Sequence, residues 1–144
     1  MSPSLPEPPA QSGHMPSWAR NGRRVGRYAL GPLLGRGGMG EVFEAWDLVL
    51  ARPVALKLLT VGSAAATVRF MQEARLQARV DHPNVCRVLD ADVEADLPFI
   101  AMQLVRGPYV KAAGLSLREV ADLMQKVAGA IHAAHRLGLV HRDL

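Results

Sequence analysis

Residues 35–42 read Gly-Arg-Gly-Gly-Met-Gly-Glu-Val, and the runs on either side of this glycine cluster are apolar. The pattern G-x-G-x-x-G-x-V has three interpretations. The glycines could close a hairpin, open a dinucleotide-binding fold, or let backbone amides approach and cover a triphosphate, because they lack a Cβ. A dinucleotide-binding fold needs a helix next and an acidic residue about 20 residues later. The sequence instead continues with a strand-like run and reaches Lys57 near that distance. The dinucleotide interpretation is therefore disfavoured, and the other two stay open.

Two charged residues further along the chain lie in apolar surroundings. Lys57 interrupts the run Val-Ala-Leu-Lys-Leu-Leu at 54–59, and Glu73 falls between Phe70 and Leu76 on the apolar arc of an expected helix. An unpaired charge in apolar surroundings is costly. Lys57 on its own also fits a solvent-facing strand position. Taken together, the two residues predict an ion pair that holds the ammonium toward phosphates, which favours the triphosphate interpretation.

The rest of the chain has the periodicity of an α+β fold. Short apolar runs separated by glycine and by Arg52-Pro53 predict an antiparallel meander. The last helix is the best specified element, because Ser116 and Glu119 form a capping box and Gly138 provides a stop. The expected strands are 28–34, 42–46, 54–59, 85–89 and 99–105, with an acidic turn at 90–96; the expected helices are 64–80 and one beginning at 116, whose apolar stripe is Val120, Leu123, Met124, Val127, Ile131, Ala134 and Leu137.

The composition is that of one globular domain of 144 residues, with 49% hydrophobic and 21% charged side chains. The single cysteine, Cys86, excludes an intrachain disulfide and a Cys-based zinc site, and its strand-like surroundings predict a small core residue. No apolar run approaches the roughly 18 residues of a membrane-spanning helix, and no secretory signal is visible. We therefore expect a cytoplasmic protein with no membrane segment in this chain.

The net charge of +4 has one local concentration, just before the first apolar run. Arg20, Arg23, Arg24 and Arg27 cluster there without interleaved aromatic residues, which argues against a nucleic-acid partner. Residues 1–24 are rich in Pro, Ser, Gly and Arg and show no periodicity, so we expect a disordered leader.

Five motifs in order resemble those of a protein kinase domain, specifically of the bacterial serine/threonine kinases that are similar to eukaryotic ones. They are Gly35–Val42, Val54-Ala55-Leu56-Lys57, Glu73, Asp81-His82-Pro83-Asn84-Val85 and His141-Arg142-Asp143-Leu144. The resemblance implies an incomplete kinase domain over residues 25–144. Its N-terminal lobe, with a five-stranded antiparallel sheet and one helix, would cover about 25–105. The first helices of a helical C-terminal lobe would cover about 106–144.

The resemblance also implies roles in binding ATP and in transferring its γ-phosphoryl group to a protein hydroxyl. Lys57 would hold the α- and β-phosphates and pair with Glu73, and Asp143 would be the catalytic base. Arg142 would bind an activation-loop phosphate, and His141 would be a scaffold residue. The implied nucleotide-binding residues are Gly35, Arg36, Gly37, Gly38, Met39 and Gly40 over the phosphates, Val42 and Ala55 against adenine, Lys57, the gatekeeper Met102, and Gln103 and Val105, whose backbone groups would bond the adenine edge.

Two further motifs of the family do not occur in these 144 residues: the catalytic-loop Asn and the Asp-Phe-Gly, which bind two Mg²⁺ ions. These residues alone are therefore expected to bind ATP but not to transfer phosphate at a useful rate, and no metal ligand is assigned among them. The apolar stripe of the last helix would be open to a partner. The alternative to a kinase is a non-catalytic module that binds nucleotide or docks on a partner, and the protein substrate is not predicted.

Overall fold

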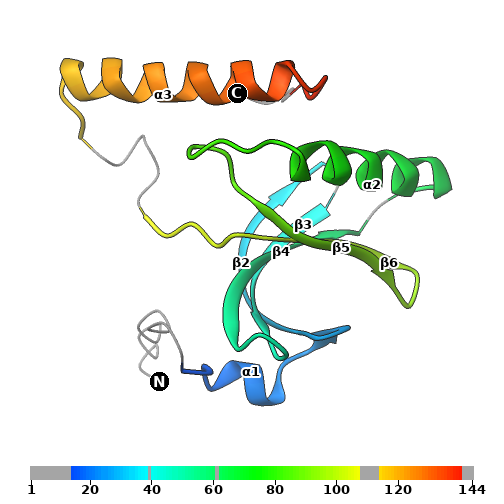
Figure 1. Ribbon diagram of the computed structural model, residues 1–144. Helices are drawn as coiled ribbons and strands as arrows, with labels where there is room; N and C mark the ends of the chain where they lie inside the picture. Colours follow the sequence, from blue (N-terminus) through cyan, green and yellow to red (C-terminus); the bar gives the residue numbers. More distant parts are fainter. Residues whose placement is uncertain (1–13, 39, 61, 108–113, 141–144) are drawn as a thin grey trace.

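The computed structural model describes residues 14–38, 40–60, 62–107 and 114–140. Its centre is a curled antiparallel sheet with the strand order β1-β2-β3-β4-β6-β5 (Figure 1). The predicted meander is confirmed, because β2, β3 and β4 pair in sequence, and β6 then pairs with β4 and leaves β5 at the edge. The elements are α1 (Trp18–Asn21), β1 (Arg24–Val25), β2 (Tyr28–Gly37), β3 (Gly40–Asp47), β4 (Arg52–Leu59), α2 (Ala64–Ala78), β5 (Val88–Glu94), β6 (Leu97–Met102) and α3 (Leu117–His135).

The sheet differs from the expected five strands in two places. The described residues form a sixth strand, β1, which pairs Val25 with Tyr28. The stretch predicted as an acidic turn at 90–96 belongs mostly to β5, and only Ala95 and Asp96 form the reversal, with φ of 46° and 64°. β5 tolerates acidic residues because it is an edge strand whose outer side chains reach solvent.

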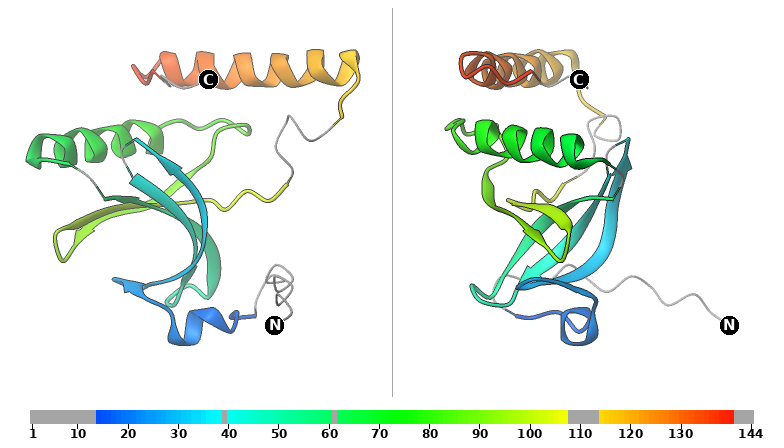
Figure 2. Two further views of the ribbon diagram at one scale, coloured as in Figure 1. Left: turned by 180° about the vertical axis from the view of Figure 1, so that it is seen from behind. Right: turned by 90° about the vertical axis from the view of Figure 1, so that its right-hand side faces the viewer.

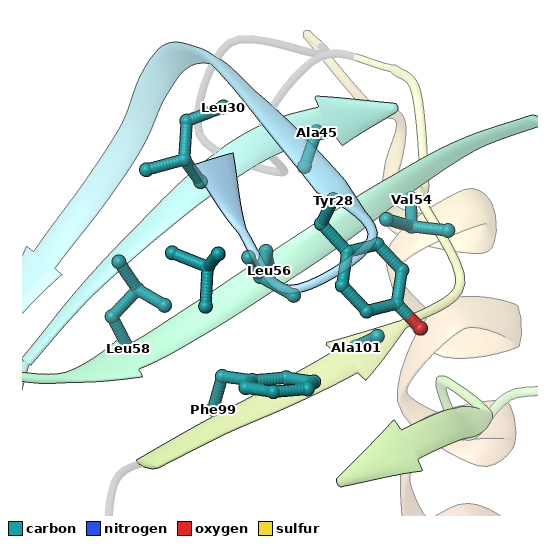
Figure 3. Close-up of a cluster of buried hydrophobic side chains, with 9 residues drawn as sticks. Tyr28, Leu30, Ala45, Val54, Leu56, Leu58, Phe99 and Ala101 are labelled. Carbon is teal, nitrogen blue, oxygen red and sulfur yellow. The ribbon is translucent and has the colours of Figure 1, made fainter. Parts of the chain in front are cut away.

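The larger core cluster fills the inside of the curled sheet, as Figure 3 shows. From Val54 on, every second side chain of β4 belongs to this core cluster, as the pleat of a strand dictates. These residues are Val54, Leu56 and Leu58. The Tyr28 and Phe99 rings pack edge to face with centroids 5.5 Å apart. These contacts fix the relative positions of the strands that carry the glycine cluster and Lys57.

A second cluster joins the other face of the sheet to α2 through Leu59 and Ile100 from the strands and Phe70 and Ala74 from the helix. The side chain of Ser63 caps α2 by accepting a hydrogen bond from the Ala66 backbone N–H. This packing places one face of α2 beside the strand that carries Lys57.

Helix α3 runs along the side of α2 that faces away from the sheet (Figures 1 and 2). Its predicted capping box is confirmed, with Ser116 and Glu119 exchanging hydrogen bonds. Gly138 adopts a φ of 80° where the helix stops, as the stop signal predicts. Two members of the predicted apolar stripe, Val120 and Met124, are 39% and 57% exposed, so part of the stripe has no cover from the described residues.

Residues 14–24 were expected to belong to a disordered leader, but the structure places α1 and the start of β1 among them. Ala19 is fully buried against Ala29 and Trp46. The Trp18 ring lies on Gly31, where a Cβ would come within 2.8 Å of the ring atoms. A four-residue helix and a two-residue strand are too short to show periodicity, so composition alone misassigns this segment. Residues 1–13, also expected to be disordered, lie outside the described part.

A polar cluster ties β2, the end of β3 and β5 together. The Tyr28 hydroxyl donates to Asp90 at 2.8 Å, and the Arg27 guanidinium lies 3.3 Å from a carboxylate oxygen of Asp47 and 3.5 Å from Asp90. Asp47 is fully buried, and its other oxygen accepts from two backbone N–H groups of the following turn. Burial and the neighbouring Asp90 raise the pKa of Tyr28 to about 12. Arg27, grouped by sequence with a basic cluster, is thus committed to carboxylates of the fold.

Candidate functional site

The glycine cluster forms the predicted hairpin between β2 and β3, in which Gly37 lies opposite Gly40. A Cβ on Gly40 would collide with the backbone carbonyl oxygen of Leu58, so the packing of β3 on β4 requires glycine there. A Cβ on Gly35 or Gly37 would meet no atom within 4 Å. The described fold therefore does not explain these two glycines, whereas the close approach of a ligand to the backbone does.

A pocket of about 640 Å³ lies against this hairpin, and we call it the glycine-loop pocket. It unites four parts of the chain: the hairpin, one residue of β4, one face of α2 and the segment after α3. Its lining residues are Gly35, Arg36, Gly37, Gly38, Gly40, Val42, Lys57, Arg69, Gln72, Glu73, Leu76, Gly138, Leu139 and Val140.

Across the hairpin, Arg36 and Glu41 form an ion pair with 2.9 Å between Nε and Oε1. The two residues are register partners on neighbouring strands, so their side chains share a face. Arg36 itself is largely exposed. The pair therefore joins β2 to β3 across the hairpin, and Arg36 also lines the pocket.

Lys57 enters the glycine-loop pocket from the middle of β4, where it lies between Val42 and Ile100 in register. Its ammonium nitrogen lies 5.6 Å from the centroid of the Phe70 ring. Lys57 and Glu73 both belong to the described residues, and no ion pair within 4 Å joins them. The predicted pair is thus not formed in this structure, although both side chains line one pocket.

The physical reason is that neither charge is buried in the core. Lys57 and Glu73 are both half-buried on the pocket wall, so neither needs a partner as strongly as the sequence suggested. The ring of Phe70, three residues before Glu73, supplies a weaker cation–π contact to the ammonium. The residue buried beside Phe70 is Ala74, whereas Leu76 lines the pocket.

Two polar residues of the pocket were missed from the sequence. Arg69 and Gln72 lie on α2 close to Glu73 and line the same pocket. Arg69 precedes Glu73 by four residues, the spacing at which helical side chains are neighbours. That spacing could have identified Arg69 once Glu73 was placed at the site.

The predicted adenine side lies outside the glycine-loop pocket apart from Val42. Ala55 of β4 and Met102 of β6 are register partners, and Ala55 is buried while Met102 is half-buried. The chain then leaves the sheet through Gln103 and Val105, which is 72% exposed. The structure thus brings Ala55 and Met102 together, next to the strand positions that face α2.

The backbone of Gln103 is already hydrogen-bonded within the protein. Its N–H donates to the carbonyl of Arg87 at 2.9 Å, and its carbonyl accepts from the Cys86 thiol at 3.1 Å. Within the described residues, no acceptor is bonded to the N–H of Val105. A carbonyl oxygen has two lone pairs, so Gln103 keeps acceptor capacity.

Cys86 differs from its prediction as a core residue in a strand. It is half-buried in the segment before β5, and its thiol donates to the Gln103 carbonyl. Burial raises the pKa of the thiol above its ordinary value, which keeps the donor proton in place. Cys86 therefore belongs to the region around Gln103 and not to the core of the sheet.

Several site predictions lie outside the described residues, namely Met39, His141, Arg142 and Asp143. Among the residues the structure does describe, no three or more His, Cys, Asp or Glu side chains group together as metal ligands. In the same part of the chain, no helix combines the length and the apolar character needed to cross a bilayer.

The fold and the sequence are both similar to those of known kinases. The Protein kinase domain family matches residues 28–144. The probable serine/threonine-protein kinase PknB of Bifidobacterium longum is 37% identical and aligns with 83% of this chain and 20% of its own length. PknA of Mycobacterium tuberculosis, a serine/threonine-protein kinase, is 38% identical, with 83% and 31% covered.

Solved structures give the same result. The kinase domain of Mycobacterium tuberculosis PknI superposes with a TM-score of 0.69 at 31% identity, over 85% of this chain and 54% of that one. The apo form of PpkA-294 gives 0.67 at 28% identity, over 92% and 56%. The chain thus spans about a fifth to a third of the curated relatives named above and about half of these solved domains. With its curled antiparallel sheet, the helix α2 packed on it and a glycine hairpin that shares a pocket with a lysine, the chain belongs to the protein kinase family.

Proposed function

We propose that the glycine-loop pocket binds the triphosphate of ATP and that the protein transfers the γ-phosphoryl group to serine or threonine hydroxyls. The observation that supports this most directly is the location of Lys57, which lines one pocket together with Gly35, Gly37 and Gly38, where a Cβ would meet no atom within 4 Å. Protein kinases in general use ATP with Mg²⁺, and the relatives are named serine/threonine-protein kinases.

Within the proposal, the hairpin and Lys57 bind different parts of the nucleotide. A Cβ at Gly35, Gly37 or Gly38 would meet no atom within 4 Å, so a phosphate can approach the backbone of the hairpin closely there and accept from its N–H groups. The ammonium of Lys57 supplies a compact positive charge for the α- and β-phosphates. Met39 remains a proposed member of this loop.

Glu73 is proposed to pair with Lys57 in the reactive arrangement. The two residues already line one pocket, and Phe70, which now contacts the ammonium, lies on the same helix. In the proposed arrangement, α2 is repositioned so that the Glu73 carboxylate replaces the Phe70 ring as the partner of the ammonium. Positioning of this helix is a recognised control point in kinases.

Adenine is proposed to lie between Val42 and Ala55 on one side and the segment from Met102 to Val105. The N–H of Val105 supports this, because it has no bonded acceptor in the described chain, and the free lone pair of Gln103 supplies an acceptor. Asp143 remains the proposed catalytic base, with Arg142 as a ligand for an activation-loop phosphate. The Mg²⁺ ions neutralise phosphate charge when bound, and no described residue is assigned to them.

The second candidate is a non-catalytic module that binds nucleotide and docks on a partner through α3. Leu117, Val120 and Met124 favour it, because these apolar side chains are exposed on one helix. A cytoplasmic location is part of either proposal, and the free thiol of Cys86 is consistent with a reducing compartment.

The test of the proposed site is nucleotide binding by the 144-residue chain, measured with a fluorescent ATP analogue. Lys57→Met should weaken binding about tenfold or more, because it removes a charge-assisted contact. Lys126→Met removes the same charge from the exposed side of α3 and should bind as the parent does. Equal affinity of all three proteins would overturn the site.

Radiolabelled ATP distinguishes the two candidate functions. The 144 residues alone should show no turnover, because they contain no Asp-Phe-Gly. In a longer polypeptide that supplies this motif, phosphotransfer that disappears with Lys57→Met supports the kinase. Nucleotide binding without any phosphotransfer in that polypeptide supports the module.

A further inference from the structure

The segment 103–106, which follows β6, lies at the boundary between the two expected lobes, and we call it the hinge. Residues of this segment line a second pocket, which we call the hinge-side pocket. Its volume is about 340 Å³. Three arginines line it: Arg52 from the start of β4, Arg87 from just before β5, and Arg106 from beyond β6. Its lining contains no acidic residue, so the only charged residues that line the cavity are three arginines.

The carboxylates that pair with two of these arginines lie outside the lining. Arg106 contacts Glu44 at 2.8 Å, and Arg87 contacts Asp81 at 3.6 Å. The Arg87 and Asp81 side chains are 71% and 94% exposed, and an ion pair so open to solvent is weak. The pocket therefore keeps a positive excess even after both pairs are counted.

The excess positive charge of the pocket comes from Arg52. Its Nε atom is buried and has no hydrogen-bond partner in the structure. Its register partner is Asp47, which shares its face of the sheet, but Asp47 is taken by Arg27 and by two backbone N–H groups. No ion pair involving Arg52 is present in the described part of the chain. Among the three lining arginines, Arg52 is thus the one without a carboxylate partner in the described part of the chain.

The remaining lining defines what the ligand can be. Pro53, Leu89 and Leu104 form apolar walls, and Gln103 adds a polar side chain at the rim. The volume is near the lower limit for ligand pockets, about 300 Å³, so it suits one small charged group. Planar guanidinium groups match phosphate oxygens in pairs, and a phosphomonoester carries close to two negative charges.

We propose that the hinge-side pocket binds a phosphomonoester dianion presented by a phosphorylated serine or threonine side chain. The anion chemistry rests on the three arginines alone. The choice of a phosphorylated side chain over a free phosphate rests on the proposed function, because a serine/threonine kinase produces such groups. The pocket shares no lining residue with the glycine-loop pocket, but its Gln103 also belongs to the segment proposed to bind adenine. The variants that test the pocket therefore change its arginines, which have no proposed role in binding the nucleotide.

The experiment measures binding of a fluorescein-labelled Gly-Ala-phosphoserine-Ala-Gly peptide to the 144-residue chain by fluorescence polarisation. The salt concentration is about 0.15 M, to screen non-specific attraction. Arg52→Gln should weaken binding about tenfold or more, the loss expected for a charged hydrogen bond. Arg118→Gln removes the same charge from an exposed position on α3 and should leave binding unchanged.

Arg87→Gln provides the second variant, because its exposed side chain can be replaced without disturbing the core. It too should weaken peptide binding, with an unchanged melting temperature and unchanged affinity for the fluorescent ATP analogue. Loss of nucleotide binding in Lys57→Met together with retained peptide binding would keep the two proposals distinct.

Three outcomes would overturn the proposal. If Arg52→Gln and Arg87→Gln bind the phosphopeptide as tightly as Arg118→Gln does, the pocket is not an anion site. If the unphosphorylated peptide binds equally well, the phosphate is not recognised. If inorganic phosphate competes at the same concentration as the phosphopeptide, the source is free phosphate and the assignment to a side chain is wrong.

Discussion

The ammonium of Lys57 lies 5.6 Å from the centroid of the Phe70 ring, while Glu73, three residues further along α2, shares the pocket with Lys57 but makes no ion pair with it. One helix thus presents an aromatic ring and a carboxylate to a single cation. The ring holds the cation in this structure, and the carboxylate holds it in the reactive arrangement that we propose. Exchange between the two is where the helix position would control activity.

The contact between Lys57 and Phe70 should appear as a coupling free energy. In a double-mutant cycle with Lys57→Met and Phe70→Leu, we expect about 0.5–1 kcal/mol of coupling in the free energy of unfolding, because a half-exposed cation–π contact contributes that much. Urea unfolding of the parent, the two single variants and the double variant measures it. Strictly additive losses would show that the ring does not hold the ammonium.

Glu73→Gln should separate stability from catalysis. The free energy of unfolding should change by less than about 0.5 kcal/mol, because the carboxylate has no ion pair to lose. Phosphotransfer by a longer polypeptide with the complete domain should fall strongly, because the Lys57 pair is needed there. Asp122→Asn, on the exposed side of α3, is the control and should change neither quantity. A loss of several kcal/mol with Glu73→Gln would mean that the ion pair is already formed.

Gly40 and Gly37 should respond differently to alanine. Gly40→Ala drives a Cβ into the Leu58 carbonyl and should lower the free energy of unfolding by about 1–3 kcal/mol. Gly37→Ala meets open space and should change it by less than about 0.5 kcal/mol. Chemical denaturation of both variants checks the contrast. Equal losses would contradict the different roles of the two glycines.

Tyr28 should make the fold sensitive to alkaline pH. Its pKa rises from 10.0 in the unfolded chain to about 12 in the folded one, so folding favours the neutral phenol. The stability that this provides is fully present below pH 10 and is lost as the pH rises toward 12. Tyr28→Phe should remove this part of the alkaline loss in unfolding measurements. Tyr109→Phe keeps the Tyr28 hydroxyl and should lose stability at alkaline pH as the parent does. Identical pH profiles for the two variants would contradict the assignment to Tyr28.

Gly31→Ala should dislodge Trp18. A Cβ at this position would come within 2.8 Å of the indole ring, so we expect a loss of about 1–3 kcal/mol and a shift of tryptophan fluorescence to longer wavelength. Gly35→Ala, which meets no atom within 4 Å, is the matched control. An unchanged emission spectrum in Gly31→Ala would show that the Trp18 ring does not pack on residue 31.

The elements that the sequence predicts correctly are those that repeat a physical pattern. The short apolar run at 54–59, bounded by Arg52-Pro53, identifies β4, and the Ser116–Glu119 capping box identifies the start of α3. Helix α2 begins at Ala64 as expected and ends two residues before the expected boundary, at Ala78. Each of these signals is local, so no knowledge of the tertiary contacts is needed to interpret it.

The errors arise where a distant part of the chain decides the outcome. Ala19 is buried because it packs against Ala29 and Trp46, and no pattern near residue 19 predicts these contacts. The acidic stretch of β5 is a strand because it lies at the edge of the sheet. The prediction that Lys57 pairs with Glu73 assumed that both side chains are fully buried. Their burial depends on how much of the pocket the rest of the chain covers, and no local pattern indicates that.

The Trp18–Gly31 contact bears on how this protein is made in the laboratory. Similarity to the family begins at Tyr28, but the folded unit already includes Ala19 and Val25. A recombinant version that begins at Tyr28 would lack the residues that cover Trp46. It would expose this aromatic side chain to solvent and promote aggregation. Expression trials should keep at least residue 14 onward, and affinity tags should precede that residue.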